Sequence, residues 1–366
     1  MAQFTYTESD FNENTCNWQQ TECQQSKFDE TLQSGWDKAV EDGHFRYKLD
    51  IEETRVIGSK KYIAQLNVKR AQERRKPDVI ESVNQPFNPA SFNFLKIKPQ
   101  EILLELVKEE DDSRPNNQVN QTQENGTDKQ EVKKRNLVVI NVSPLEYGHV
   151  LLVPDIDACQ PQVLTESSMR VSLEMMLLSK HRGFRIGFNS LCAFASVNHA
   201  HLHAYYLDRE LFVESVPVKH ICGDLYELDA MPAKGFAFQL HKTGVDKLSK
   251  IIFHIADYFQ KHEVAHNMYM IRGPVFNEDQ HSTNRTIRVY LWPRKKFIGS
   301  MWLKDEEAFN VALVELAGHL PVKVKEMFYD LDEEKIESTI RDAALEDSEY
   351  NSIKQDVSNI CQSFIS

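Results

Sequence analysis

The spacing of apolar residues predicts helices in four stretches of the chain. Apolar side chains recur every three or four positions around residues 28–40, 169–177, 245–259 and 336–340, so each stretch has one apolar face. The last of these lies in an acid-rich run near the C-terminus. We therefore expect it to be a helix on the outside of the molecule, where its apolar face packs against the core.

Short apolar runs predict strands between these helices. The predicted strands are Phe45–Ile51, Arg55–Ile57, Tyr62–Leu66, Asn136–Val142, Val150–Val153, Phe184–Phe188, Val197–Tyr206, Ala237–Leu240, Asn267–Ile271 and Thr286–Trp292. The order strand, strand, helix, strand, strand occurs in the first half, and a similar order recurs after a connection rich in Pro and Gly. This recurrence predicts an α+β fold of two related halves, with antiparallel sheets and flanking helices.

Two polar segments interrupt this pattern. Residues 1–25 are dominated by Asn, Gln, Glu, Ser and Thr, and residues 109–133 are charged and rich in amides. Neither segment carries enough apolar surface to offset the entropy of ordering, so we expect a disordered tail and a disordered internal loop. The first half then spans residues 26–215, and the second half spans 216–366 with a C-terminal helix.

Charge and cysteine content narrow the class of protein. The chain has 366 residues, with 43 basic and 55 acidic side chains and a net charge of −12, which argues against nucleic acid or an anionic membrane as a partner. No secretion signal or membrane span is indicated. The six cysteines include no C-x-x-C pair, so we expect neither a disulfide framework nor a cysteine zinc site, and a cytoplasmic location.

Three alternating histidines carry the candidate chemistry. If His199, His201 and His203 lie on a strand, its two-residue period places all three rings on one face. A neutral imidazole is a nucleophile near pH 7, and neighbouring rings can fix its tautomer and neutralise phosphate charge. The same row is compatible with a zinc or copper site, or with structural histidines. The row alone therefore leaves nucleotide, metal and structural interpretations open.

A second motif favours nucleotide chemistry. Residues Asn141–Pro154 follow the pattern Asn-x-x-Pro-x-x-x-Gly-His-x-Leu-x-x-Pro and resemble the strand-turn-strand signature of the histidine-triad superfamily, which precedes the triad by about this distance. The resemblance implies that Asn141 holds the ribose hydroxyls and that His201 attacks the α-phosphorus. It further implies that His199 and His203 flank His201.

The resemblance assigns two more residues and extends to a narrower family. Asn189 and Ser196 are implied to contact phosphate or the leaving oxygen. The segments Phe45–Tyr47, Tyr62–Asn67, Gln85–Phe87, Phe92–Phe94 and Gly187–Ala195 resemble the plant GDP-galactose phosphorylases and their animal relatives, which act on GDP-glucose. This resemblance covers about residues 28–325.

Membership of that family implies the reaction and its partners. Inorganic phosphate would cleave a GDP-hexose, GDP-α-D-glucose in the animal members, to GDP and hexose 1-phosphate through a covalent guanylyl-histidine. The implied partners are these small molecules, with no cofactor and no metal. One departure is that His203 stands where the plant enzymes have Gln and where hydrolases of the superfamily have His. A nucleotide hydrolase and a catalytically inactive nucleotide-binding regulator are therefore the alternatives.

Phosphate also requires positive charge, which bidentate arginine supplies well. The candidates are Lys69, Arg70, Arg272, Arg285, Arg288 and Arg294. Of these we select Arg70 and Arg288 as substrate-binding residues. The second half has no His-x-His row, because its equivalent strand, Thr286–Trp292, offers arginine and aromatic residues instead. We expect this half to shape the site.

Overall fold

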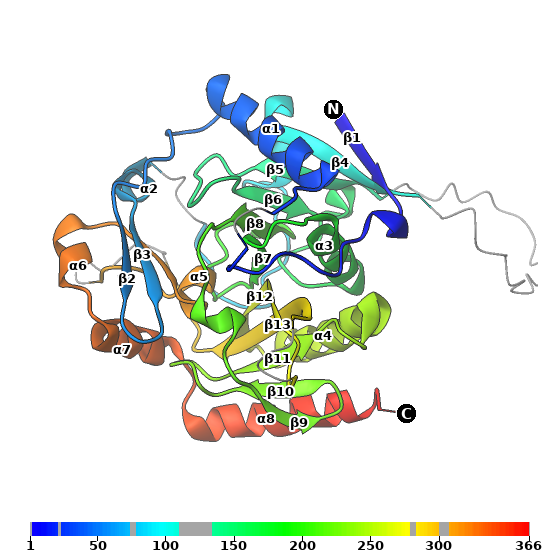
Figure 1. The fold of residues 1–366 in the computed structure, drawn as a ribbon, viewed down its shortest axis with the longest axis vertical. Helices are drawn as coiled ribbons and strands as arrows, with labels where there is room; N and C mark the ends of the chain where they lie inside the picture. Colours follow the sequence, from blue (N-terminus) through cyan, green and yellow to red (C-terminus); the bar gives the residue numbers. More distant parts are fainter. Residues whose placement is uncertain are drawn as a thin grey trace, which may run out of the picture.

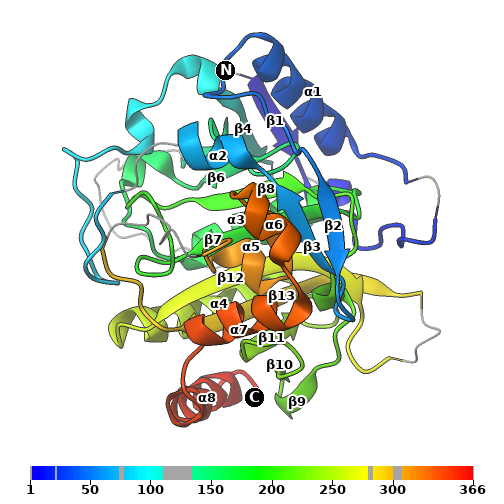
Figure 2. The same cartoon turned by 90° about the vertical axis from the view of Figure 1, so that its left-hand side faces the viewer.

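One large sheet organises the protein. The computed structural model describes residues 2–20, 23–73, 78–109, 134–278, 283–299 and 307–365. Their 11-stranded sheet has the order β1-β4-β5-β6-β8-β7-β12-β13-β11-β10-β9, and a separate three-stranded sheet has the order β14-β3-β2 (Figures 1 and 2). All neighbouring strands of the large sheet are antiparallel except β1 and β4, which are parallel.

The strands of the large sheet are β1 (Ala2–Tyr6), β4 (Ile102–Lys108), β5 (Asn136–Ile140), β6 (Val150–Val153), β7 (Phe184–Asn189), β8 (Leu202–Tyr206), β9 (Lys219–Cys222), β10 (Leu225–Leu228), β11 (Gly235–Gln239), β12 (Ala265–Pro274) and β13 (Arg285–Arg294). The small sheet contains β2 (Thr54–Ile57), β3 (Tyr62–Leu66) and β14 (His319–Val322). The helices are α1 (Lys27–Glu41), α2 (Val68–Glu73), α3 (Glu166–Leu178), α4 (Gly244–Lys261), α5 (Leu313–Leu316), α6 (Lys325–Asp330), α7 (Glu333–Ala343) and α8 (Asp347–Gln362).

The chain order of these elements repeats. The series β4, β5, β6, α3, β7, β8 is followed by β9, β10, β11, α4, β12, β13. In the sheet the two series run outward in the same order from the central pair β7–β12, where Asn189 lies opposite Asn267. The predicted α+β fold with two related halves is confirmed, and the two halves share one continuous sheet.

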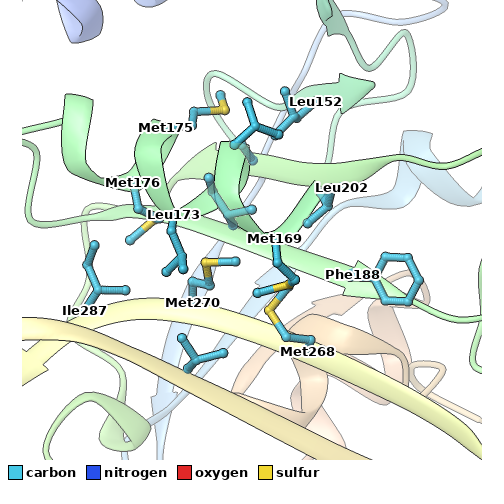
Figure 3. Packing of buried hydrophobic residues seen from close by; sticks show 14 of the residues in the cluster. Leu152, Met169, Leu173, Met175, Met176, Phe188, Leu202, Met268, Met270 and Ile287 are labelled. Atoms are coloured by element: carbon cyan, nitrogen blue, oxygen red, sulfur yellow. The ribbon is translucent and has the colours of Figure 1, made fainter. Parts of the chain in front are cut away.

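The two faces of the large sheet bury different cores. On one face α3 and α4 pack together, and Figure 3 shows Met169 and Leu173 of α3 facing Met268 and Met270 of β12. Leu202 of β8 joins the same apolar cluster. The other face carries aromatic residues of β8, β12 and β13 and is covered partly by α5, α6, α7 and the small sheet. This second face also holds the site described below.

Helix and strand positions follow the apolar pattern closely in several places. The predicted helices around residues 28–40, 169–177, 245–259 and 336–340 correspond to α1, α3, α4 and α7. Ser26 caps α1 through its side chain, which accepts from the Asp29 N–H at 3.1 Å. Ile336 and Ile340 of α7 are fully buried, so the helix near the C-terminus packs as expected.

Two predicted strands differ from the structure. Residues 45–51 form no strand, although Tyr47 is buried and its hydroxyl donates to the Pro144 carbonyl. The strand predicted for Val197–Tyr206 begins only at Leu202. His199 and His201 therefore precede the strand. The backbone of His201 bonds to the Gln162 side chain, and the Ala200 N–H donates to the Gln160 carbonyl, so this stretch pairs with a loop instead of with a neighbouring strand.

The N-terminal prediction is wrong for residues 2–20. Phe4 and Tyr6 of β1 are buried, β1 pairs with β4, and the Tyr6 hydroxyl donates to Glu174 at 2.8 Å. The alternation of Phe4 and Tyr6 with exposed Gln3 and Thr5 is a strand pattern hidden by the polar composition around it. The internal loop predicted for residues 109–133 lies, apart from Glu109, outside the described residues.

The cysteine prediction also needs a correction. Cys16 and Cys23 form a disulfide, although no C-x-x-C motif marks them. The other four cysteines are free thiols. No helix in the described part of the chain is long and apolar enough to cross a membrane.

Candidate active site

A cavity of about 690 Å³ opens beside β8. Its lining includes His201 and His203, together with Asn141, Asn189 and Ser196 from the first half of the chain. The lining also includes the aromatic residues Phe45, Phe92 and Phe94. Residues after 216 contribute Asn310, Leu313, Glu315 and Lys323. Both halves therefore line one cavity.

The turn between β5 and β6 places Asn141 and His149 next to each other. The Asn141 N–H donates to the His149 carbonyl at 3.0 Å, and the Asn141 side-chain oxygen accepts from the Ser143 N–H at 3.0 Å. Gly148 has a φ of +66°, and a Cβ there would lie 2.5 Å from the Tyr206 ring. Only glycine suits this position, because it combines a left-handed conformation with a close contact.

His201 is held by a buried glutamine. The Gln162 side chain is fully buried, accepts from the His201 N–H at 2.9 Å, and donates to the His201 carbonyl at 3.0 Å. The same amide donates to the Asn189 carbonyl at 2.9 Å. Gln162 thus makes the hydrogen bonds to the His201 backbone that a neighbouring strand would otherwise make, and it links the histidine to β7.

The ring of His201 has a defined orientation. Its Nδ1 lies 2.8 Å from the His199 carbonyl oxygen. Because a carbonyl can only accept, Nδ1 carries the proton of the neutral ring and the lone pair lies on Nε2. This is the tautomer in which Nε2 can act as a nucleophile.

His199 does not line the cavity. Its Nδ1 accepts from the Phe94 N–H at 3.0 Å, and its ring lies 5.2 Å from the Phe87 ring and 5.5 Å from the Phe94 ring. The Phe94 ring is also 5.1 Å from His201. Burial lowers the pKa of His199. His199 therefore packs against Phe87 and Phe94 and supplies the carbonyl that orients His201.

His203 lies between His201 and His149. Its ring centroid is 5.2 Å from that of His201, and its Nδ1 is 3.1 Å from Nε2 of His149. Burial lowers the pKa of both His203 and His149 well below the ordinary value. Both rings are therefore neutral around pH 7.

Asn189 is oriented from the second half of the molecule. The Asn267 amide donates to the Asn189 side-chain oxygen at 2.6 Å, and the Asn267 oxygen accepts from Arg294 at 3.3 Å. Asn267 is fully buried. Because the Asn189 oxygen is already used, its NH₂ group is the part of the side chain available to a ligand in the cavity.

The six basic candidates lie in different surroundings. Arg70 lines the cavity and donates to the Ser143 carbonyl, while Lys69 pairs with Asp50 outside it. Arg272 is fully buried and donates to main-chain carbonyls, including those of Met176 and Ser179. Arg285 lies 3.6 Å from Glu214. Arg294 does not line the cavity, but it donates to Asn267, which in turn donates to Asn189 in the lining.

The structure contradicts the selection of Arg288 as a substrate-binding residue. Arg288 is buried, donates to the Pro274 carbonyl at 2.7 Å and lies over the Phe276 ring. It is not among the residues that line the cavity. The two-residue period of β13 places Arg288 on the face of the sheet that also holds the site, but other segments cover this part of the face.

Sequence reasoning did not assign a role to four residues that build the site. His149, Gln162, Asn267 and Glu315 either line the cavity or position a residue that does. Only His149 had a signal, because it belongs to the Asn141–Pro154 motif. Burial raises the pKa of Glu315 to about 7. Across the described ranges, no group of three or more His, Cys, Asp or Glu side chains is arranged to hold a metal ion.

Comparison with solved structures defines the fold class. The chain resembles yeast Ap4A phosphorylase Apa2 in complex with Ap4A, with a TM-score of 0.55 and 13% sequence identity, over 87% of this chain and 98% of that one. The same yeast protein in complex with AMP gives a TM-score of 0.54. This likeness shows the fold class: an α+β protein in which two related halves of one chain share a single sheet.

Comparison of sequences defines the family. Residues 27–205 match the family described as "GDPGP1-like, N-terminal domain", and residues 211–364 match "GDPGP1-like, C-terminal domain". The chain belongs to this family, which confirms the resemblance found in the sequence.

Two animal proteins named GDP-D-glucose phosphorylase 1 and one plant protein are similar to the chain. The protein of Danio rerio is 43% identical over 96% of both chains, and that of Homo sapiens is 45% identical over 90% of this chain and 83% of its own. GDP-L-galactose phosphorylase 2 of Arabidopsis thaliana is 29% identical over 87% of this chain and 73% of its own.

Proposed function

We propose that this protein is a nucleotidyltransferase that cleaves GDP-α-D-glucose with inorganic phosphate, releasing GDP and glucose 1-phosphate. The observation that carries the proposal is the orientation of His201, which lines the cavity and whose Nδ1 donates to a main-chain carbonyl, so that Nε2 is the nitrogen of the neutral ring that carries the lone pair. The names of the relatives, GDP-D-glucose and GDP-L-galactose phosphorylases, support this substrate class.

The reaction proceeds in two displacements. Nε2 of His201 attacks the α-phosphorus, the bond from that phosphorus to the bridging oxygen breaks, and glucose 1-phosphate leaves with the electron pair. An oxygen of inorganic phosphate then attacks the same phosphorus. The P–N bond breaks, its electron pair returns to Nε2, and GDP is released.

The other cavity residues have supporting roles in this proposal. Asn141 binds the ribose hydroxyls, and Arg70, Asn189, Ser196 and His203 contact the phosphate oxygens, since each lines the cavity. His199 does not contact the substrate in this proposal; its main-chain carbonyl orients the ring of His201.

The two halves of the chain have different roles in this proposal. We place the catalytic half at residues 26–215 and assign residues 216–366 to shaping the site. Residues Asn310–Lys323 of the second half support this assignment because several of them line the cavity.

A cytoplasmic location is part of the proposal. Four of the six cysteines, Cys159, Cys192, Cys222 and Cys361, are free thiols and support a reducing compartment, whereas the Cys16–Cys23 disulfide does not. The small-molecule substrates require no nucleic acid or membrane partner. Fractionation of cells that express the protein tests the location.

The test of the activity uses purified protein, GDP-glucose and a range of phosphate concentrations. We expect GDP and glucose 1-phosphate to form only with phosphate, and a guanylyl adduct to accumulate without it. His201→Ala should lower turnover by about 10³-fold or more, as expected for loss of a nucleophile. The matched control is His220→Ala, because His220 is exposed, does not line the cavity, and contacts the Gly223 carbonyl and the Tyr226 ring.

Two outcomes would contradict the proposal in different ways. GMP formed at the same rate with and without phosphate would identify a hydrolase. GDP-glucose binding without turnover and without an adduct would identify a nucleotide-binding regulator.

A further inference from the structure

The cavity has an apolar part and a charged part. Six apolar lining residues belong to one contiguous cluster or pack directly against it, namely Phe92, Phe94, Ile97, Val139, Leu151 and Val197. In the charged part, burial raises the pKa of Glu315 to about 7, and the positive charges of Lys323 and Arg70, which also line the cavity, oppose this rise. The apolar part therefore suits a nucleobase, and the charged part suits phosphate groups.

A second acid lies beside the apolar part. Among the lining residues that the structure describes, only Glu101 and Glu315 are acids. Glu101 ends the short 3-10 helix Pro99–Glu101 and directly precedes β4. Ile102, the first residue of β4, packs against the same apolar cluster. Glu101 thus brings a carboxylate to a part of the cavity that is otherwise mainly hydrophobic.

A row of directly opposed residues crosses the sheet from the histidines to β4. The row consists of His203 in β8, Leu151 in β6, Val139 in β5 and Ile102 in β4. Its first three members line the cavity, so the cavity follows the row over strand spacings of about 4.8 Å each. Glu101 adjoins the far end of this row.

The row matches the order of groups in the substrate. In the proposed function the α-phosphorus lies at His201, whose ring is 5.2 Å from that of His203. Asn141, which follows β5, holds the ribose. Because the ribose separates the α-phosphate from the base in every nucleotide, the base continues from Asn141 toward β4. This places the edge of the base near Glu101.

A carboxylate at this place distinguishes guanine from adenine. The Watson–Crick edge of guanine carries two neighbouring donors, N1–H and the 2-amino group, whereas adenine has an acceptor at N1 and no 2-amino group. An ionised carboxylate only accepts, so it can bind both guanine donors and would face a lone pair on adenine. No described residue donates a side-chain hydrogen bond to Glu101, which is half-buried.

We propose that Glu101 is the residue that selects guanine, by accepting hydrogen bonds from N1–H and the 2-amino group while the base packs against the apolar part of the cavity. The inference rests on the proposed function. Stacking on aromatic rings does not discriminate between bases, so the selection requires a polar group. Lys98 lines the cavity at the start of the same turn and can donate to O6, where adenine has an amino group.

The test measures equilibrium binding of GDP, IDP and ADP by isothermal titration calorimetry. IDP differs from GDP only in lacking the 2-amino group, so it loses one of the two hydrogen bonds to Glu101. We expect wild-type protein to bind GDP about tenfold or more tightly than IDP, and ADP more weakly still. In Glu101→Gln the affinity for GDP should fall about 10- to 100-fold, and the preference for GDP over IDP should shrink to about threefold or less.

The matched control is Glu315→Gln, which changes the other acid of the lining. Its preference for GDP over IDP should equal that of the wild type, whatever the affinities themselves. An unchanged preference in Glu101→Gln, or an equal loss of preference in Glu315→Gln, would overturn the inference. Equal affinities of the wild-type protein for GDP and IDP would overturn it without any variant.

The same proteins separate this inference from the proposed function. Wild-type protein that prefers GDP through Glu101 but forms no GDP from GDP-glucose and phosphate would refute the reaction and leave the base assignment intact. Wild-type protein that carries out the reaction, combined with an unchanged base preference in Glu101→Gln, would refute only the base assignment. A wild-type protein that binds no GDP would refute both.

Discussion

Strands β8 and β13 occupy equivalent places in the two halves but have different roles. Each is the first strand outside the central β7–β12 pair. Each also buries alternate apolar side chains in the core beneath α3 and α4. On the opposite face, His203 of β8 lines the cavity, whereas Arg288 and Tyr290 of β13 are buried.

The difference comes from the segments that cover each strand. The turn between β5 and β6 brings His149 to His203 and leaves space for a ligand. Over β13, the Tyr290 hydroxyl donates to the Val213 carbonyl at 2.8 Å, and Arg288 donates to the Pro274 carbonyl. The repeated topology therefore preserves the sheet and the helix-covered core, while the covering segments decide whether the other face becomes a site.

The largest expected effect is on the stability of the central strand pair, and it concerns a histidine with a structural role. His266 of β12 is buried between the rings of Phe188 and Phe259, and burial lowers its pKa to about 4. Because the folded-state pKa lies below the unfolded value of about 6.5, its contribution to stability is present above pH 6.5 and is lost as the pH falls toward 4.

His266→Phe should remove this acid sensitivity. Between pH 7 and 4.5 the variant should lose about 2 to 3 kcal/mol less unfolding free energy than the wild type, as measured by urea denaturation. His220→Ala is the control, because its ring is exposed, and its profile should follow the wild type. Parallel profiles for His266→Phe and the wild type would show that His266 does not carry the effect.

The next effect concerns the contact that joins the halves. Asn267→Leu removes the donor to Asn189, so the Asn189 amide is no longer oriented toward the ligand. We expect kcat/KM for GDP-glucose phosphorolysis to fall about 10- to 100-fold, corresponding to about 1.4 to 2.7 kcal/mol. Asn189→Ala should lower it similarly, and the double variant should be little worse than either single one. Fully additive losses would separate Asn267 from the orientation of Asn189.

The smallest effect lies on the covered face of β13. Tyr290→Phe removes the hydrogen bond to the Val213 carbonyl and should lower the unfolding free energy by about 1 kcal/mol. Because Tyr290 does not line the cavity, kcat/KM should stay within about twofold of the wild type. A tenfold loss of activity without a larger loss of stability would mean that the covered face is coupled to the site.

Much of the fold could be predicted because its signals are local. The spacing of Phe28, Leu32 and Trp36 predicts α1, and the predicted bounds of β6 match Val150–Val153. These patterns are read from near neighbours in the chain, and burial of one face then follows from the period. β1 was missed because a short alternation within a polar segment is stabilised by its partner β4, which is about 100 residues away in the chain.

The candidate site was predictable only in part. Asn141, Asn189, Ser196, His201 and His203 line the cavity as their motifs imply. The alternation of histidines suggested a longer strand than the one that forms. The strand is shorter because the Gln162 side chain bonds to the backbone of His201 before β8 begins. Arg288 was misplaced because strand period determines which face a side chain takes but not what covers that face.

The sequence by itself determined the repeated order of elements, the motif around Asn141 and the identity of the histidines. These depend on residue type and spacing, which act within a few positions of the chain. The tertiary structure alone decided that Asn267 orients Asn189, that Glu315 joins the cavity, and that His149 lies against His203. The physical reason is that these contacts join residues far apart in the chain, and the type and spacing of near neighbours do not determine which distant side chains meet.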